Sequence, residues 1–269
     1  MKYSVLPSVI LLAFCGTASA ATYFQTFTFP DGTSNFGDGS VIATSTNAAD
    51  PQPTPATVQG NQLRLTLAGT AGGTNSFSVP ALANSSLGWT ASFNLTITDI
   101  AGGNPPADGL SFNYGSAALG TLGAAEEGMG VAAAPENLSF EIDTWMNFDA
   151  EQGVNISGNH LGVDVGQLAF TNGPILNDGT TVTGLVTMSW SPTTGASFST
   201  TGLLTNANFT NVATTFTPSN NHTFIISGRV GGANQTVLID NLSITTVPET
   251  SGVALLGAAG LGLLLRRRR

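Results

Sequence analysis

The sequence predicts an all-β fold, an antiparallel β-sandwich. Between the two ends of the chain, short stretches of alternating apolar and polar residues follow one another, and alternate residues of a strand share one face. Breaks rich in glycine, proline and asparagine separate these stretches, no amphipathic helical pattern lies between them, and nothing repeats at a fixed period. Many short strands without crossover helices are typical of two antiparallel sheets packed face to face.

The strands are predicted from their apolar periodicity. Residues 62–67 place three leucines on one face, and residues 89–97 place Trp89, Phe93 and Leu95 among the apolar residues of one face. The other predicted strands are residues 23–29, 109–114, 138–143, 160–165, 181–190, 223–228 and 236–244.

Composition limits the classes of ligand. The formal net charge is −9, and Arg64 and Arg229 are the only basic residues between the two ends of the chain. Nucleic-acid binding needs a basic surface, so the sequence excludes it. An acidic domain with few cations suits divalent ions and neutral ligands. The one cysteine, Cys15, lies near the N-terminus, so a core, together with any bound metal, must stabilise the domain without a disulfide.

The N-terminus is typical of a secretory signal. Lys2 supplies a positive charge, residues 9–14 are apolar, and Ala18-Ser19-Ala20 has the small residues of a cleavage site. The apolar run is too short for a transmembrane helix. We therefore expect residues 1–20 to be a signal peptide and residues 21–246 to form the exported domain.

The C-terminus carries a second targeting pattern. Val247-Pro248-Glu249-Thr250 precedes an apolar stretch, residues 252–265, and four arginines close the chain. Residues 247–269 resemble the bacterial PEP-CTERM sorting signal, although Thr250 stands where that signal usually has a second proline. The resemblance implies cleavage by an exosortase, transient anchoring in the inner membrane through a short transmembrane helix, and delivery to the cell surface or extracellular matrix. A plain C-terminal membrane anchor is the alternative.

An acidic motif lies in the predicted strand at residues 138–143. Glu141 and Asp143 share one face there, about 7 Å apart by the rise of a strand. Two ionised carboxylates held this close need a cation, a proton or wide exposure to solvent. Asn147 and His160 follow and add an amide oxygen and an imidazole. Oxygen-rich ligands with one imidazole suit a hard cation with a transition ion beside it.

These residues carry a resemblance to the L-type lectins, the legume-lectin and cargo-receptor group with the concanavalin A-like jelly-roll fold. The run from Phe140 to Asn147 is similar to the metal-binding strand of that family, and residues 159–164 are similar to its histidine segment. Residues 107–112, Ala-Asp-Gly-Leu-Ser-Phe, match an upstream element of the family. Residues 228–236 and 239–244 resemble the closing turn and strand of bacterial exported lectin-like domains, so the resemblance extends over residues 23–244.

The resemblance implies a metal site. Glu141 and His160 would bind a transition ion, Mn²⁺ or another. Asp143 would bridge this ion and a Ca²⁺. The carbonyl of Trp145 and the side chain of Asn147 would bind the Ca²⁺.

A second bridging aspartate of the family corresponds in position to Asn155, which supplies only a neutral oxygen. Asp149 and Glu151 lie slightly earlier and are the alternatives.

The resemblance also implies a saccharide site. Asp108 would accept hydrogen bonds from sugar hydroxyls, Asn147 would donate its amide, and Trp145 would offer an aromatic platform. A backbone amide would come from the glycine-rich loop at residues 120–130, at Gly128. Calcium would fix this shell without touching the sugar. The family often has a cis peptide bond before the aspartate, which corresponds here to Ala107-Asp108.

Two rival functions remain open. Family 16 glucanases share this fold and have a second glutamate where this chain has Met146 or Asn147, neither of which can protonate a leaving group. We therefore expect no enzymatic activity. A structural matrix protein without sugar affinity is the other alternative. The sequence favours an exported, calcium-dependent protein that binds carbohydrate, a glycan or exopolysaccharide.

Overall fold

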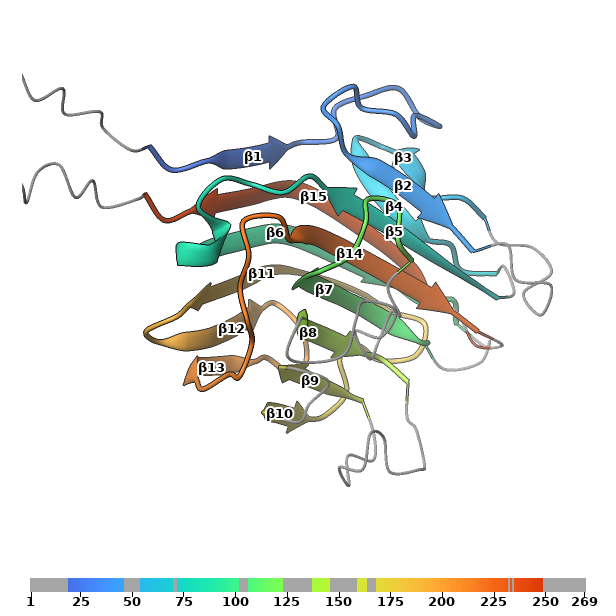
Figure 1. The fold of residues 1–269 in the computed structure, drawn as a ribbon. Helices are drawn as coiled ribbons and strands as arrows, with labels where there is room; N and C mark the ends of the chain where they lie inside the picture. The colour runs from blue at the N-terminus through green and yellow to red at the C-terminus, as the bar shows by residue number, and fades with distance from the viewer. Residues whose placement is uncertain are drawn as a thin grey trace, which may run out of the picture.

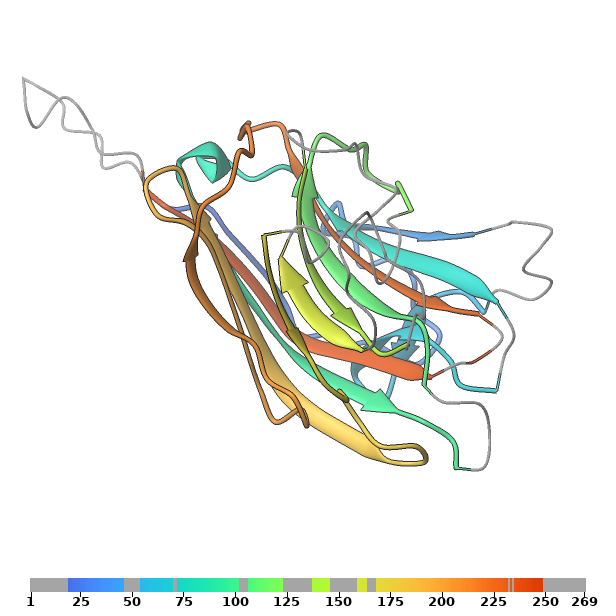
Figure 2. The same cartoon turned by 90° about the horizontal axis from the view of Figure 1, so that it is seen from below.

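The structure, a computed structural model, describes residues 19–45, 54–69, 72–101, 106–122, 137–145, 159–163, 168–231, 233 and 235–248. Within these residues the chain forms two antiparallel β-sheets packed face to face (Figure 1 and Figure 2). A short 3₁₀ helix, η1 (Ser85–Leu87), precedes one strand. The predicted all-β sandwich is therefore confirmed.

The larger sheet has eight strands among the described residues. Its path in space is β13 (Asn208–Val212), β12 (Gly195–Thr201), β11 (Thr181–Ser191), β6 (Trp89–Thr98), β15 (Thr236–Thr246), β4 (Gln62–Thr66) and β3 (Thr57–Gln59), with β1 (Thr22–Gln25) also paired to β15. The central strands β6 and β11 pair from Thr98 and Thr181 to Trp89 and Trp190 without a register shift.

The smaller sheet has seven strands in the part of the chain that the structure describes. Its order is β10 (Ala169–Asn172), β9 (His160–Val163), β8 (Asn137–Asp143), β7 (Gly109–Gly115), β14 (Thr223–Val230), β5 (Gly73–Val79) and β2 (Val41–Thr44). The acidic motif lies on β8, so this sheet positions the candidate site.

The first predicted strand is too long. β1 ends at Gln25, and Phe27 has a left-handed backbone with φ 53°. The Phe27 amide donates to the side-chain oxygen of Gln25 at 3.0 Å, and the Phe27 ring packs edge-on against Phe36 and Phe77. Burying this ring turns the chain out of the sheet, so residues 26–29 are not strand.

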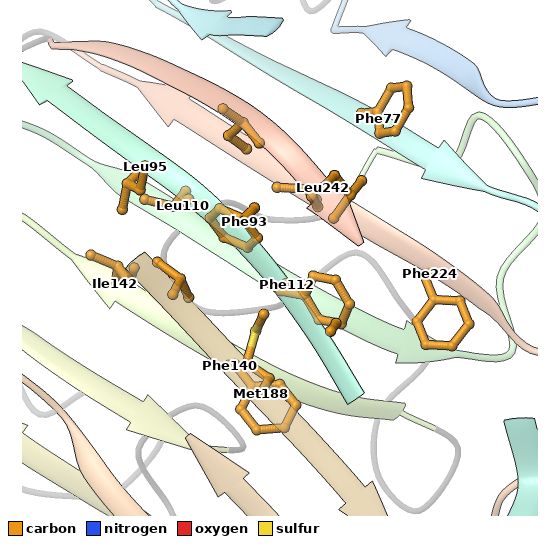
Figure 3. Packing of buried hydrophobic residues seen from close by; sticks show 14 of the residues in the cluster. Phe77, Phe93, Leu95, Leu110, Phe112, Phe140, Ile142, Met188, Phe224 and Leu242 are labelled. Carbon is orange, nitrogen blue, oxygen red and sulfur yellow. The ribbon is translucent and has the colours of Figure 1, made fainter. Parts of the chain in front are cut away.

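The core lies between the two sheets, and Figure 3 shows part of it. The indole of Trp89 contacts the rings of Phe112, Tyr114, Phe140 and Phe224, with centroids 5.4–5.9 Å apart. Such tilted and edge-to-face aromatic packing contributes beyond the area that it buries. This cluster joins the larger sheet to β7, β8 and β14 and fixes the strands that carry the site.

The other face of the smaller sheet is polar and nevertheless buried. Ser76 and Ser78 of β5 are both inaccessible to solvent. Their hydroxyls bond to the backbone of the segment after β7: Ser76 Oγ donates to the Thr121 carbonyl at 2.8 Å, and the Gly120 amide donates to Ser78 Oγ at 3.1 Å. A covering loop brings backbone groups that need partners, and serine supplies them.

The two ends of the described chain lie together. Thr22 pairs with Thr245, and the Thr246 amide donates to the Ala21 carbonyl at 2.9 Å. Both are at the end of the sandwich where Trp89 lies, because Thr246 pairs with Trp89. The predicted signal peptide and the predicted tail fall almost entirely outside the described residues. Among the helices that the structure describes, none is long and apolar enough to cross a membrane.

Candidate metal and saccharide site

Three neighbouring strands bring the acidic motif and the histidine together. Asp143 of β8 pairs with His160 of β9 on one side and with Gly109 of β7 on the other. Glu141 lies two residues before Asp143, so both carboxylates leave β8 on the face away from the core. Glu141, Asp143 and His160 are each at most 1% exposed. Side chains from distant parts of the sequence therefore meet in one buried polar cluster.

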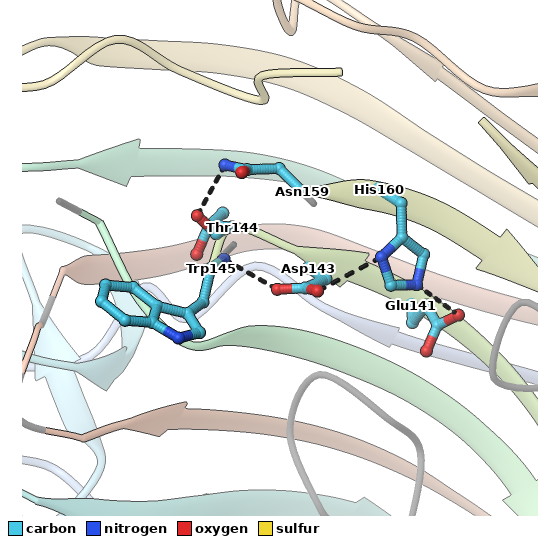
Figure 4. Close-up of polar contacts among 6 residues, drawn as sticks. All are labelled: Glu141, Asp143, Thr144, Trp145, Asn159 and His160. Atoms are coloured by element: carbon cyan, nitrogen blue, oxygen red, sulfur yellow. Dashed lines mark hydrogen bonds and ion pairs between the residues drawn. The ribbon is translucent and has the colours of Figure 1, made fainter. Parts of the chain in front are cut away.

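The imidazole of His160 lies between the two carboxylates (Figure 4). Its Nε2 is 3.1 Å from Glu141 Oε1, and its Nδ1 is 3.2 Å from Asp143 Oδ2. Burial by itself lowers the pKa of His160, but the contacts with Asp143 and Glu141 outweigh it and raise the pKa to about 10. With the pKa raised this far, the protonated ring is the favoured form of His160 at neutral pH.

The cluster holds more acidic than basic groups. Two carboxyl groups face one imidazole, and burial raises the pKa of Asp143 even though His160 lowers it. A buried site with surplus negative charge attracts a proton or a cation. Two carboxylates and an imidazole are also a donor set that a metal ion accepts, so these residues fit the ions implied by the resemblance.

The donors of this cluster are arranged around the imidazole, whose two nitrogens face different carboxylates. Within the described residues, no three histidine, cysteine or acidic side chains are grouped to hold a metal ion.

The chain leaves β8 in a fixed direction. Asp143 Oδ1 accepts a hydrogen bond from the Trp145 amide at 2.7 Å, and the Asn159 side chain donates to the Thr144 carbonyl at 2.7 Å (Figure 4). The indole of Trp145 is partly exposed and lies on the side of Asp143 away from His160. Trp145 is therefore available to a ligand beside the cluster.

Asp108 lies next to the end of β8. Its carbonyl accepts from the Thr144 amide at 3.0 Å, and its own amide donates to the Arg229 carbonyl at 3.1 Å. The peptide bond between Ala107 and Asp108 is cis, as the sequence comparison anticipated. The Asp108 carboxylate, which is 14% exposed, lies 3.3 Å from Nε of Arg229.

Several candidate residues fall outside the described residues. These are the predicted calcium and bridging ligands and the predicted backbone donor: Asn147, Asp149, Asn155 and Gly128. Their roles stay predictions. The described part of the site consists of Asp108, Glu141, Asp143, Trp145 and His160.

The sequence predicted no site role for Arg229, which is one of two basic residues between the chain ends and lies within the closing turn of the resemblance. The scarcity of basic residues is the sequence feature that could have indicated a role for it. The contact with Asp108 depends on the pairing of β14 with β7, which aligns Arg229 with Gly109.

A hollow among the described residues lies away from the acidic cluster. A cavity of about 550 Å³ opens at the β11–β12 hairpin, at the end of the sandwich opposite the acidic cluster. It is lined by uncharged residues that include Trp190, Thr194, Asn211 and Phe216. Trp190 and Phe216 are only 3% and 9% exposed, so their rings offer a ligand little surface. The acidic cluster remains the better candidate site.

Comparison with known proteins identifies the fold. No protein-family model matches the chain, and no curated protein matches its sequence. Among solved structures, peanut lectin with a nine-residue peptide matches with a TM-score of 0.62 at 17% identity, covering 87% of this chain and all of the lectin.

Two further legume lectins match over a similar extent. A Bauhinia forficata lectin in complex with GalNAc has a TM-score of 0.62 at 14% identity, covering 86% of this chain and 99% of the lectin. The metal-free form of lectin I-B4 from Griffonia simplicifolia has a TM-score of 0.58 at 15% identity, covering 84% and 99%. At these identities the similarity shows the fold alone: the chain has the concanavalin A-like sandwich of the legume lectins.

Proposed function

We propose that this protein is an exported, calcium-dependent carbohydrate-binding protein without catalytic activity. The observation that carries the proposal is the buried cluster of Glu141, Asp143 and His160 beside Asp108. It lies at one end of the smaller sheet, within a fold that matches sugar-binding lectins, one of them solved with GalNAc.

Cations would replace the protons of the buried cluster. Asp143 would hold calcium together with Asn147 and the Trp145 carbonyl, and Glu141 with His160 would hold a transition ion. Asn155 or Asp149 would complete the shell. The bound ions supply positive charge that balances the buried carboxylates. His160 must give up a proton to become a ligand, so metal binding releases protons.

The saccharide would bind beside the metals. Asp108 accepts from sugar hydroxyls, because an ionised carboxylate is a pure acceptor. Trp145, partly exposed beside Asp143, offers its ring to an apolar sugar face. Asn147 and the backbone of Gly128 would add donors. No second carboxylic acid is available at Met146 or Asn147 to act as a general acid, which supports binding over hydrolysis.

Export follows from the two predicted terminal signals. The described chain ends lie at the Trp89 end of the sandwich, whereas β8 reaches the acidic cluster at the other end (Figure 1). A tail held in the inner membrane, or cleaved by an exosortase, therefore leaves the candidate site directed away from the membrane. This orientation supports a role at the cell surface or in the extracellular matrix.

A glycan array with the full chain tests the proposal. With millimolar CaCl₂ we expect binding to a subset of immobilised glycans that EDTA abolishes and added calcium restores. Release of reducing sugar from bound β-glucans should stay at background. Binding that persists in EDTA would remove the metal from the mechanism, and an array without any signal would favour the structural matrix role.

A further inference from the structure

We propose that Arg229 makes the saccharide site selective for acidic sugars, namely glycans that carry a uronate carboxylate. This inference rests on the proposed function and names its ligand class. Its basis is the contact between Arg229 and Asp108, together with the exposure and scarcity of that guanidinium.

Arg229 is fixed to Asp108 twice. Its carbonyl accepts the Asp108 amide at 3.1 Å, and its Nε lies 3.3 Å from Asp108 Oδ2. β14 and β7 pair so that Arg229 is opposite Gly109, the residue after Asp108. Backbone pairing in the sheet thus places the main chain of Arg229 beside Asp108, and its side chain reaches the carboxylate from there.

The guanidinium remains accessible to a ligand. The Arg229 side chain is 46% exposed, whereas the Asp108 side chain is 14% exposed. The pair therefore presents mainly its positive partner to solvent. An arginine beside a carboxylate acceptor makes a mixed surface, in which Asp108 accepts from a hydroxyl and Arg229 donates to a neighbouring oxygen.

Room for such a ligand is kept by Gly231. A Cβ at this position would lie 3.2 Å from Asp108 Oδ2. Any larger side chain would press on the carboxylate that is to receive the sugar. The absence of a side chain at residue 231 therefore avoids a close contact with the Asp108 carboxylate.

The charge of the chain makes Arg229 distinctive. The other basic residue between the chain ends, Arg64, lies on β4 of the larger sheet and donates to Gln59, Thr57 and the Pro55 carbonyl. Arg229 is thus the arginine located at the candidate site. A planar guanidinium matches a carboxylate in a bidentate geometry that a neutral hydroxymethyl group cannot provide.

The test compares sugars that differ only at C6. Calorimetry with the calcium-loaded full chain measures the binding of two pairs of sugars. One pair is methyl glucuronide and methyl glucoside, and the other is methyl galacturonide and methyl galactoside. We expect the acidic member of at least one pair to bind about tenfold more tightly, the scale of one charge-assisted hydrogen bond. Arg229→Gln should abolish this preference, and Arg229→Lys should retain part of it.

Arg64→Gln is the matched control, because it removes the same charge from the other sheet and should leave the preference intact. Thermal unfolding shows whether each variant is folded, and Arg229→Lys serves if Arg229→Gln is not. Equal binding of both members of each pair, or a preference that survives Arg229→Gln, overturns this inference alone. Failure of every sugar to bind the wild-type chain overturns it together with the proposed function.

Discussion

Asp143 is the residue at which the contacts of the candidate site converge. One carboxylate oxygen accepts the Trp145 amide, the other faces the His160 ring, and its backbone pairs with both neighbouring strands. Glu141 contacts the other nitrogen of the His160 ring and lies two residues before Asp143 on β8. Burial raises the pKa of Asp143, and the two carboxyl groups raise the pKa of His160, so this cluster favours the binding of protons.

Asp143→Asn should separate metal binding from folding. The amide removes the surplus charge and leaves Glu141 and His160 as a matched pair, so the metal-free stability should change by no more than about 1 kcal/mol. Calcium should stabilise the wild-type chain by about 2.7 kcal/mol when free calcium is about 100 times its Kd, and should not stabilise the variant. Urea unfolding with CaCl₂ and with EDTA measures both effects.

Asp31→Asn is the control for that experiment. Asp31 is exposed in a turn and accepts the Gly60 amide, so its substitution should leave the calcium-dependent stabilisation unchanged. If Asp143→Asn retained the full calcium effect, the ion would have to bind elsewhere.

At the scale of the element, β5 shows how a strand with few apolar residues is built. Asn75 on this strand is buried, and both the oxygen and the nitrogen of its side-chain amide form two hydrogen bonds. Its oxygen accepts from Thr44 Oγ1 and the Ala56 amide, and its nitrogen donates to the carbonyls of Thr54 and Leu65. Asn75 thereby joins β5 and β2 of the smaller sheet to β4 of the larger one.

Asn75→Ala should destabilise the fold by about 2–4 kcal/mol, because two buried carbonyls and a buried amide lose their partner. Asn75→Asp should be at least as costly at neutral pH, since a carboxylate cannot donate to the carbonyls of Thr54 and Leu65 and is buried. Asn94→Ala, on the partly exposed face of β6, is the control and should stay within about 0.5 kcal/mol. Equal effects of Asn75→Ala and Asn94→Ala would mean that the network contributes nothing.

The strands that the sequence predicted are those with large apolar residues at alternate positions, such as β4, β6, β8 and β15. The strands that it missed are β2, β3, β5, β10, β12 and β13, which are short or rich in serine, threonine and glycine. β5 was missed because only two apolar residues, Phe77 and Val79, alternate with its serines, which is too few for a clear period-two pattern. The burial of Ser76 and Ser78 under a loop depends on tertiary structure and has no local sequence signal.

The same limit applies to the candidate site. The shared face of Glu141 and Asp143 follows from local strand spacing. The approach of His160 requires the register of β8 and β9, and only the resemblance to a family suggested it. The contact between Arg229 and Asp108 joins strands far apart in the sequence, and no local pattern indicates it.

At the scale of the whole molecule, the sandwich separates its chain ends from its candidate site. β6 runs from Trp89, beside the chain ends, to Thr98, which pairs with Thr181 and Thr236 at the opposite end. β14 ends at Val230, one residue after the Arg229 that contacts Asp108. A chain tethered through its C-terminus therefore presents Asp108 and the acidic cluster outward.

Attaching the protein to beads through a single introduced cysteine, in either of two orientations, tests this arrangement. The predicted mature chain has no cysteine of its own, because Cys15 precedes it. Thr193→Cys places a thiol in the exposed β11–β12 turn at the end with the termini, and Ala101→Cys places one after β6 at the site end. When each protein is coupled to beads through its thiol, the Thr193→Cys protein should capture a large polysaccharide several-fold better than the Ala101→Cys protein. In the Ala101→Cys protein the candidate site faces the bead, and the bead surface keeps a polymer away from it. In free solution the two variants should bind a monosaccharide alike, which shows that neither substitution damages the site. Equal capture of the polymer in both orientations would place the glycan on a different face of the sandwich.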